Sequence, residues 1–272
     1  MRNRSPQRRV FVAMSAALAL TALAPANGAA AGKDHPAATA AQQHADRRDF
    51  TDAEILEGFF KTAFGAEYHL SGQVDRIRKF DGPVRVYAEG EASPGRRAEL
   101  ARVVEDIAAR VNHLDIAMTE DSDEANVTVH LLRDRNLNKT IASFYGRAQA
   151  RDIHKTLDPQ CLSGFRKNDK FEIIHSDVLL TIDNGDFVFL DCAYEELLQS
   201  LGPINDTDSV PWTMFNDKVQ KGYFDIYDQY LMNILYHPEI KPGMTVQEVQ
   251  GVMPQVLQDV RAFVGRSNGS GE

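Results

Sequence analysis

The order in which the hydrophobic period changes along the chain constrains the fold more than any other feature of the sequence. Apolar residues recur with a helical spacing at 51–64, alternate as in a strand at 82–90, and return to a helical spacing at 95–112. Further strands are expected at 114–120, 126–132 and 176–183. Helices are expected from there to the end of the chain. This order predicts one α+β domain in which a mixed sheet packs on helices.

Local signals mark several boundaries. Two helices are expected to begin at capping boxes, Thr51 with Glu54 and Thr245 with Glu248. Pro238 is expected to end a helix at His237, and Pro254 to open a new turn within the last helix. Asn184 and Gly185 are typical of a turn. The segment 136–170 has a weak pattern rich in Gly, Pro, Asn and Lys, and it is expected to be irregular.

The N-terminal segment has the pattern of an export signal. Four arginines and no acidic residue precede an apolar run at 10–24, and this run is short for a membrane span. A membrane anchor is the alternative to a signal peptide. The pair Arg8-Arg9 fits the twin-arginine export pattern, but such a pair is also common in ordinary signal peptides. The predicted organisation is a signal peptide at 1–26, a disordered linker at 27–49, one domain at 50–266 and a flexible tail at 267–272. The protein is therefore expected to be periplasmic or secreted, with no stable membrane span after processing.

The charge excludes one class of partner. The formal net charge is -9, and it becomes more negative when the N-terminal arginines are removed. Because binding to nucleic acid depends on neutralising phosphates, an acidic chain without a Lys/Arg-rich run is not expected to bind it.

The chain has two cysteines, Cys161 and Cys192. In an exported protein an even number of cysteines favours a disulfide, and two buried free thiols are the alternative. A zinc site is not expected from them, because the sequence has no C-x-x-C or H-x-x-x-H pairing.

The predicted helix at 189–201 has one apolar and one polar face. The polar face carries Cys192, Glu195, Glu196 and Gln199. It is either a solvated surface or, if Cys192 is bridged to Cys161, a layer beneath a covering loop. Two adjacent acids with a nearby amide can ligate a hard cation, share a proton as acid and base, or hydrogen-bond to that loop. Asn205 and Asp206 would add oxygen donors.

The same helix resembles the active-site helix of metzincin-type zinc proteases. The spacing E-E-x-x-Q-x-x-G-x-x-N follows H-E-x-x-H-x-x-G-x-x-H, and Met214 stands where that family has its Met-turn. The resemblance implies a zincin-like fold with a degenerate active-site helix. It assigns Glu195, Gln199 and Asn205 to the ligand positions, Glu196 to the general base and Gly202 to the glycine. Because amide oxygens are poor zinc ligands, zinc proteolysis is not expected.

A larger part of the chain, 83–244, is similar to a proteobacterial family of exported proteins with a domain of unknown function. The shared pattern is C-x-x-E-E-x-x-Q-x-L-G-P-x-N-D, then F-N-D, then L-Y-x-P-x-x-x-x-G-M. In this chain the first motif begins at Cys192, the second at Phe215 and the third at Leu235. This resemblance implies membership of a family and supplies no activity.

Together these features predict an exported, non-catalytic protein that binds a peptide, a protein or an envelope component. No cofactor and no metal are expected, and the histidines are scattered without a ligand spacing. An edge strand such as 176–183 would pair with an extended chain. The alternative is a hydrolase that uses the Glu195/Glu196 pair, with or without an oxygen-ligated metal ion.

Overall fold

The computed structural model describes residues 49–64, 75–156, 160–203, 205–216 and 218–269. The predicted signal peptide and all but the last residue of the predicted linker lie outside these residues. In the described part the chain forms an α+β domain with a five-stranded mixed sheet and seven helices.

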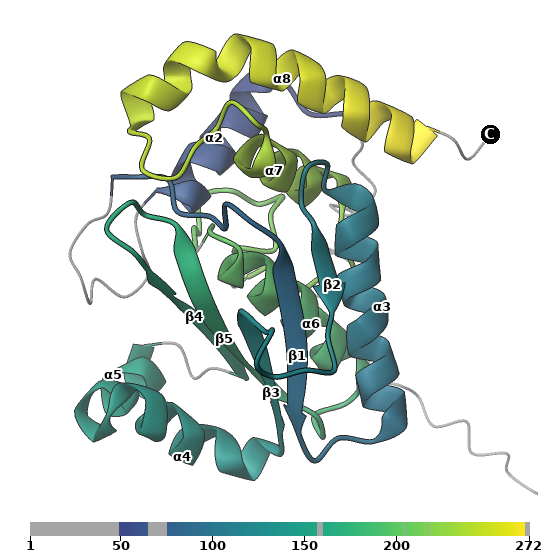
Figure 1. Cartoon of the computed structure of the whole chain (residues 1–272), viewed down its shortest axis with the longest axis vertical. Coiled ribbons are helices and arrows are strands. Elements are labelled where there is room, and N and C mark those ends of the chain that lie inside the picture. The colour runs from purple at the N-terminus through teal and green to yellow at the C-terminus, as the bar shows by residue number, and fades with distance from the viewer. Residues whose placement is uncertain (1–48, 65–74, 157–159, 204, 217, 270–272) are drawn as a thin grey trace, which may run out of the picture. The chain divides into compact units, whose positions relative to one another are not determined.

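The sheet has the strand order β2-β1-β3-β5-β4 (Figure 1). Its strands are β1 (Val84–Gly90), β2 (Ile116–Met118), β3 (Val127–Leu132), β4 (Cys161–Lys167) and β5 (Ile173–Thr181). The strands β2, β1, β3 and β5 run parallel, and β4 pairs antiparallel with β5. The prediction that 176–183 lies at an edge is wrong, because β5 pairs with both β3 and β4. The edge strands are β2 and β4.

Helices lie on both faces of this sheet. They are α2 (Asp52–Ala63), α3 (Pro94–Arg110), α4 (Asp134–Tyr145), α5 (Arg147–Thr156), α6 (Asp186–Ser200), α7 (Ile226–Tyr236) and α8 (Val246–Gly269). The inner face, covered by α3 and α6, carries Val86, Val129 and Val178 in the main core. The outer face is covered at one end by α4 and α5, and α2, α7 and α8 pack together beyond one end of the strands (Figure 1).

In the segment 136–170, the described residues 136–156 and 160–170 lie mostly in helices and a strand, and the prediction of an irregular region is wrong there. The segment forms most of α4, then α5 and β4, with Gly146 at a φ of 81° ending α4. The apolar side chains of α4 and α5 form a small core with two side chains of the sheet: Leu137, Ile141, Ala150, Ile153, Leu162 and Leu179. Each helix offers only a narrow apolar stripe to this core, and so the pattern is weak in the sequence.

The predicted helix starts are confirmed, whereas the end of the chain differs from its prediction. Both capping boxes form, and in the second the Thr245 N–H donates to Glu248 Oε2 over 2.8 Å. Pro254 does not open a turn, since α8 continues through it with the proline on the exposed side. The predicted tail is helical as far as Gly269, and Asn268 Nδ2 donates to Gln229 Oε1 over 2.8 Å.

Within the described residues, none of the helices combines the length and the apolar character that crossing a bilayer requires.

Candidate functional site

Helix α6 carries the residues that the sequence marks as a site, and it packs against β4 and β5. Gly185, with a φ of 99°, provides the turn before its first residue. The predicted disulfide between Cys161 and Cys192 is confirmed, with 5.9 Å between the two Cα atoms. This bond joins β4 directly to α6. The cover over the polar face of α6 is therefore a strand of the sheet, whereas the sequence predicted an irregular loop.

The polar face of α6 is buried beneath this strand. Glu196 and Gln199 are each 6% exposed, and Glu195 is half-buried. Gln199 Oε1 accepts a hydrogen bond from Ser163 Oγ over 3.4 Å, while its Nε2 donates to Asp206 Oδ1 over 2.6 Å. The amide thus joins β4 to the segment that follows α6. We call Cys161, Ser163, Cys192, Glu196, Gln199 and Asp206 the α6–β4 cluster.

Gly202 and Asn205 have structural contacts of their own. Gly202 has a φ of 142°, and a Cβ there would lie 2.3 Å from the carbonyl oxygen of Arg78, so this position requires glycine. Asn205 Nδ2 donates to the carbonyl oxygen of Lys61 over 2.6 Å, which ties the segment to the end of α2. Asn205 therefore points to α2, and Gln199 points to β4 and Asp206. Among the described residues there is no group of three or more His, Cys, Asp or Glu side chains that could hold a metal ion.

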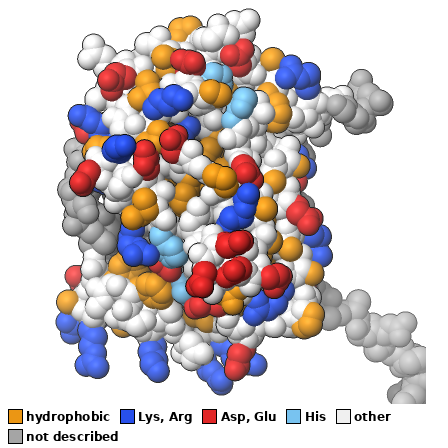
Figure 2. All heavy atoms as spheres, viewed as in Figure 1, with side chains coloured by type: hydrophobic (Ala, Val, Ile, Leu, Met, Phe, Trp, Pro, Cys, Tyr) orange, Lys and Arg blue, Asp and Glu red, His pale blue; other side chains and the backbone are white. Residues whose placement is uncertain are grey.

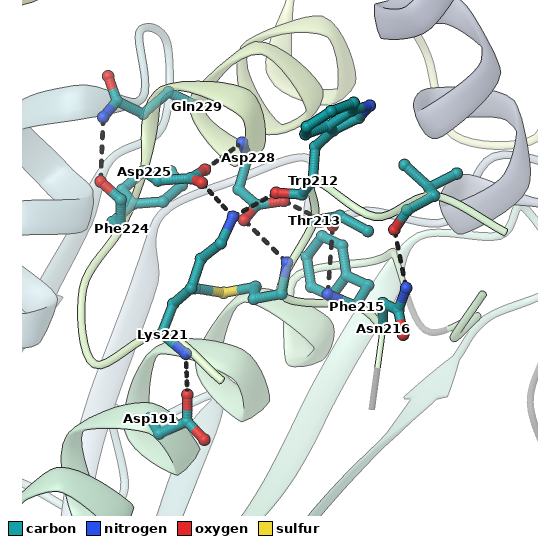
Figure 3. Close-up of polar contacts among 12 residues, drawn as sticks. Asp191, Trp212, Thr213, Phe215, Asn216, Lys221, Phe224, Asp225, Asp228 and Gln229 are labelled. Carbon is teal, nitrogen blue, oxygen red and sulfur yellow. Dashed lines mark hydrogen bonds and ion pairs between the residues drawn. The ribbon is translucent and has the colours of Figure 1, made fainter. Parts of the chain in front are cut away.

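Met214 lies in a second buried polar region, at the start of α7. Its side chain is 1% exposed, and its backbone N–H donates to Asp228 Oδ2 over 3.0 Å. Lys221, Asp225 and Asp228 form the centre of this region, which we call the Lys221 cluster. Figure 3 shows the Lys221 side chain directed at Asp225 and at the backbone of Trp212. The sequence analysis did not find this cluster, although an Asp before a helix with another Asp three residues later was a signal of a helix start.

A third polar group lies on the outer face of the sheet, and the sequence analysis also missed it. His130 on β3 lies between two carboxylates, with 2.6 Å from Nδ1 to Glu89 Oε1 and 2.9 Å from Nε2 to Asp177 Oδ1. His175 Nε2 lies 3.5 Å from the same oxygen of Asp177. We call Glu89, His130, His175 and Asp177 the outer ladder. The strand alternation could have placed these four side chains on one face, but which strands are neighbours was not known.

The contacts in the outer ladder stabilise its charges. Burial opposes the charged form of His130, but hydrogen bonds to Asp177 and Glu89 outweigh it and raise the pKa of this histidine. Burial likewise opposes the charged form of Asp177, yet hydrogen bonds to His130 and His175 hold its pKa well below the usual range. The contacts therefore favour the charged forms of both His130 and Asp177. Figure 2 shows acidic side chains gathered beside histidines on this face.

Tyr145, at the end of α4, is close enough to both the outer ladder and the α6–β4 cluster for the charges of Asp177 and Glu196 to act on it. Its hydroxyl is 2.5 Å from the position that a Cβ on Gly164 of β4 would occupy. Burial, followed by the charges of Glu196 and Asp177, raises the pKa of Tyr145 to about 12. The Tyr145 hydroxyl is therefore affected by the charge of an acid on each face of the sheet, Asp177 on the outer face and Glu196 on the inner face. It lies against Gly164, where β4 has no side chain.

A cavity of about 310 Å³ lies between the ends of α3 and α7 and the side of α8. Its lining includes Asn112, His113, His237, Asp259 and Arg266. His113 is held at a φ of 63°, and His237 Nε2 lies 3.4 Å from Asp259 Oδ2. Burial lowers the pKa of His237, against the opposing effect of Asp259. No residue of this cavity was singled out as a site by the sequence.

A family model described as a protein of unknown function (DUF2927) matches residues 52–255. The chain belongs to the DUF2927 family. The DUF2927 match begins with α2 and ends within α8, so it includes the α6–β4 cluster, the Lys221 cluster and the outer ladder. No curated protein and no solved structure matches the chain.

Proposed function

We propose that this DUF2927 protein is an exported, non-catalytic binding protein on a zincin-like fold, and that it binds an extended segment of a peptide or an envelope protein. The observation that carries the proposal is the position of Gln199. This residue, which would be a zinc ligand in a metzincin, joins Ser163 of β4 to Asp206 beneath the sheet. The face that corresponds, on this proposal, to the catalytic face of a metzincin therefore contributes to the fold and is not presented to a substrate.

The relation to the metzincin-type fold is part of this proposal. In its support, α6 follows β5 of a mixed sheet and carries Glu196, while Met214 lies in the core further along the chain. The contacts of α6 also explain why residues of the signature C-x-x-E-E-x-x-Q-x-L-G-P-x-N-D are needed for the fold. Its Cys, Gln and Asn each make a contact that holds α6, β4 or the end of α2 in place, and its Gly lets the chain pass close to the carbonyl oxygen of Arg78.

Export is supported by the disulfide, because such bonds persist in oxidising compartments. The signal peptide is a prediction from the sequence.

The proposed binding surface is the edge of β4. This strand has seven residues, whereas the other edge strand, β2, has three. On its second side, β4 pairs with none of the other strands found in the described part of the chain. The disulfide and Gln199 fix β4 to α6, so it is a rigid template for an added strand. Arg166 and Lys167 are exposed at its end, and their charge favours an acidic segment.

A peptide-display selection on the mature protein, followed by calorimetry, tests this proposal. We expect extended acidic peptides whose affinity falls about tenfold with Arg166→Glu, because like charges would then meet. Gln250→Glu, on the exposed side of α8, is the matched control and should leave the affinity unchanged. Peptides methylated at alternate backbone nitrogens should bind weakly, since added strands depend on main-chain hydrogen bonds. The proposal would be contradicted if Arg166→Glu and Gln250→Glu lowered the peptide affinity equally, or if the selection gave no binding peptide.

The hydrolase alternative predicts a different result with metals. On our proposal neither Zn²⁺, Ca²⁺ nor a chelator changes the melting temperature, because only a ligand that prefers the folded state stabilises it. A Zn²⁺-dependent stabilisation that is lost in Glu195→Ala and Gln199→Ala would contradict the non-catalytic reading. Tightly held metal at one ion per chain would likewise favour the Glu195/Glu196 hydrolase.

A further inference from the structure

The Lys221 cluster places an amine and a carboxylate in direct contact where water is excluded. The Lys221 side chain is 1% exposed, and its Nζ contacts Asp225 Oδ2 and the carbonyl oxygen of Trp212 (Figure 3). The backbone N–H of Lys221 donates to Asp191 Oδ1, which fixes the start of this segment against α6. A buried ion pair with a helix cap is the simplest reading of such a contact.

The two oxygens of Asp225 have separate roles. Oδ1 accepts the backbone N–H of Asp228 over 2.9 Å and so caps α7. Oδ2 is the oxygen that contacts Lys221 Nζ. The carboxylate can therefore lose Oδ2 without losing the helix cap.

A third ionisable group completes the cluster. Asp228 is fully buried, and its two carboxylate oxygens accept from Thr213 Oγ1 over 2.6 Å and from the Met214 N–H over 3.0 Å. Burial, assisted by the charge of Asp225, raises the pKa of Asp228 well above its usual range. Asp228 is therefore an acid that can hold a proton near neutral pH beside the Lys221–Asp225 pair.

The apolar surroundings favour a neutral product over an ion pair. Phe215, Phe224 and Tyr227 are each buried around the cluster. Charged groups lose hydration in such a place, and an amide that keeps its hydrogen bonds is far less costly to bury than an ion pair. Burial opposes the charged form of Lys221, but the charges of Asp225 and Asp228 outweigh it and raise the pKa of the amine, so the neutral amine forms only when its proton passes to a carboxylate. Transfer of the ammonium proton to Asp225 gives the neutral amine and acid.

We propose that Lys221 and Asp225 condense to form an intramolecular isopeptide bond. Nζ of the neutral amine attacks Cγ of the protonated Asp225 carboxyl, and the C–N bond forms as the bond from Cγ to Oδ2 breaks. Asp228 gives its proton to the leaving hydroxyl and receives one from the nitrogen. One water is released, no oxidant or other reactant is consumed, and Asp228 is regenerated.

The product keeps the remaining contacts of the cluster. The amide oxygen is the former Oδ1, which still caps α7 through the Asp228 N–H. The single hydrogen left on Nζ is directed to the carbonyl oxygen of Trp212. Because Lys221 and Asp225 are four residues apart, the bond closes a small ring immediately before α7. Every donor and acceptor of the amide thus has a partner already in place.

Intact-mass measurement of the full mature protein, after reduction of its disulfide, tests the proposal directly. We expect a mass lower by one water than the sequence gives for the observed N-terminus. Trypsin should leave the bond after Lys221 uncut, and fragmentation should show Lys221 joined to Asp225. A cyclised aspartate would also lack one water, but mild alkali restores that water whereas an isopeptide bond persists. A mass equal to that of the sequence, or a water restored by alkali, would overturn the proposal.

Variants separate the three roles. Lys221→Arg keeps the positive charge but should have the full mass of its sequence. Asp228→Asn keeps Lys221 and Asp225 but should form the bond slowly or not at all. Lys218→Arg, an exposed lysine paired with Asp208, is the matched control and should still lack one water. A missing water in Lys221→Arg would overturn the proposed bond, and unchanged formation in Asp228→Asn would overturn the role of Asp228.

Discussion

The two faces of the sheet both carry polar side chains, and they use them differently. On the inner face, the α6–β4 cluster combines a disulfide with the neutral pair of Ser163 and Gln199, all buried beneath β4. On the outer face, His130 is 15% exposed and bridges Glu89, which is 50% exposed, and Asp177, which is 28% exposed. These two inner contacts join neutral, buried groups, whereas the outer ladder consists of ionisable side chains that are partly hydrated.

This difference follows from the cost of burying charge. An amide that loses water recovers most of the cost through one or two hydrogen bonds, but an ion pays several times more. The ladder therefore occupies the face that α4 and α5 leave partly open. The disulfide and the bond between Ser163 and Gln199 should then contribute to stability at all pH values, and the outer ladder only within a limited range. Four predictions test this contrast.

The largest effect is expected from the disulfide. Cys192→Ser should lower the free energy of unfolding by about 3 kcal/mol, because a bridge across 31 residues constrains the unfolded chain. Urea denaturation measures this, and reduction of the wild type should give a similar loss. Two thiols that react with a labelling reagent in the native, unreduced protein would contradict the bond.

Gln199→Ala should cost about 2 kcal/mol, since it leaves the buried Ser163 hydroxyl and Asp206 without this partner. The part of this loss that comes from Ser163 should vary little with pH, because neither the hydroxyl nor the amide titrates in this range, whereas the part that comes from Asp206 should fall when its carboxylate is protonated. Gln255→Ala on the exposed side of α8 is the matched control, where the loss should stay within about 0.5 kcal/mol. If both variants lose the same free energy of unfolding, Gln199 does not join β4 to the segment after α6 as we describe.

His130→Ala should cost about 1 kcal/mol, and this cost should depend on pH. The raised pKa of His130 gives stability that is present below the ordinary value of 6.5 and is lost as the pH rises through the folded value. The lowered pKa of Asp177 gives stability that is present above 3.8 and is lost as the pH falls through the folded value. The difference from wild type should therefore be largest between these two ordinary values. A difference that does not change from pH 4 to pH 8 would show that His130 acts by packing alone.

The smallest effect is expected from a pair that belongs to neither face. Lys218 and Asp208 are 70% and 69% exposed, and their nitrogen and oxygen are 2.7 Å apart. Lys218→Ala should change the free energy of unfolding by about 0.3 kcal/mol, because water screens exposed pairs. The effect should vanish in high salt. A loss as large as that of His130→Ala would mean that partial burial does not explain the strength of the outer ladder.

Much of the fold could be predicted from the sequence, but the covering of the site could not. The strand at 176–183 was found from its apolar run, and its place inside the sheet was missed because β4 lay in a segment with little pattern. Because β4 was not found in the sequence, the segment that covers α6 was predicted to be a loop. The polar face of α6 was identified correctly, but a helix pattern cannot show whether that face meets water or a strand.

The capping boxes at Thr51 and Thr245, the alternation in β1 and β3, and the oxygen-rich face of α6 depend on residues a few positions apart, so the sequence determined them by itself. The pair of Cys161 and Cys192 was predicted because the chain offers no other choice of partners. The tertiary structure alone decided the contacts of Gln199 with Ser163 and of Asn205 with Lys61, which join residues 36 and 144 positions apart. It also decided the outer ladder, whose members come from three different strands. A hydrogen bond needs its two atoms within about 3 Å, and for residues so distant in sequence only the packing of the sheet on α6 brings them that close.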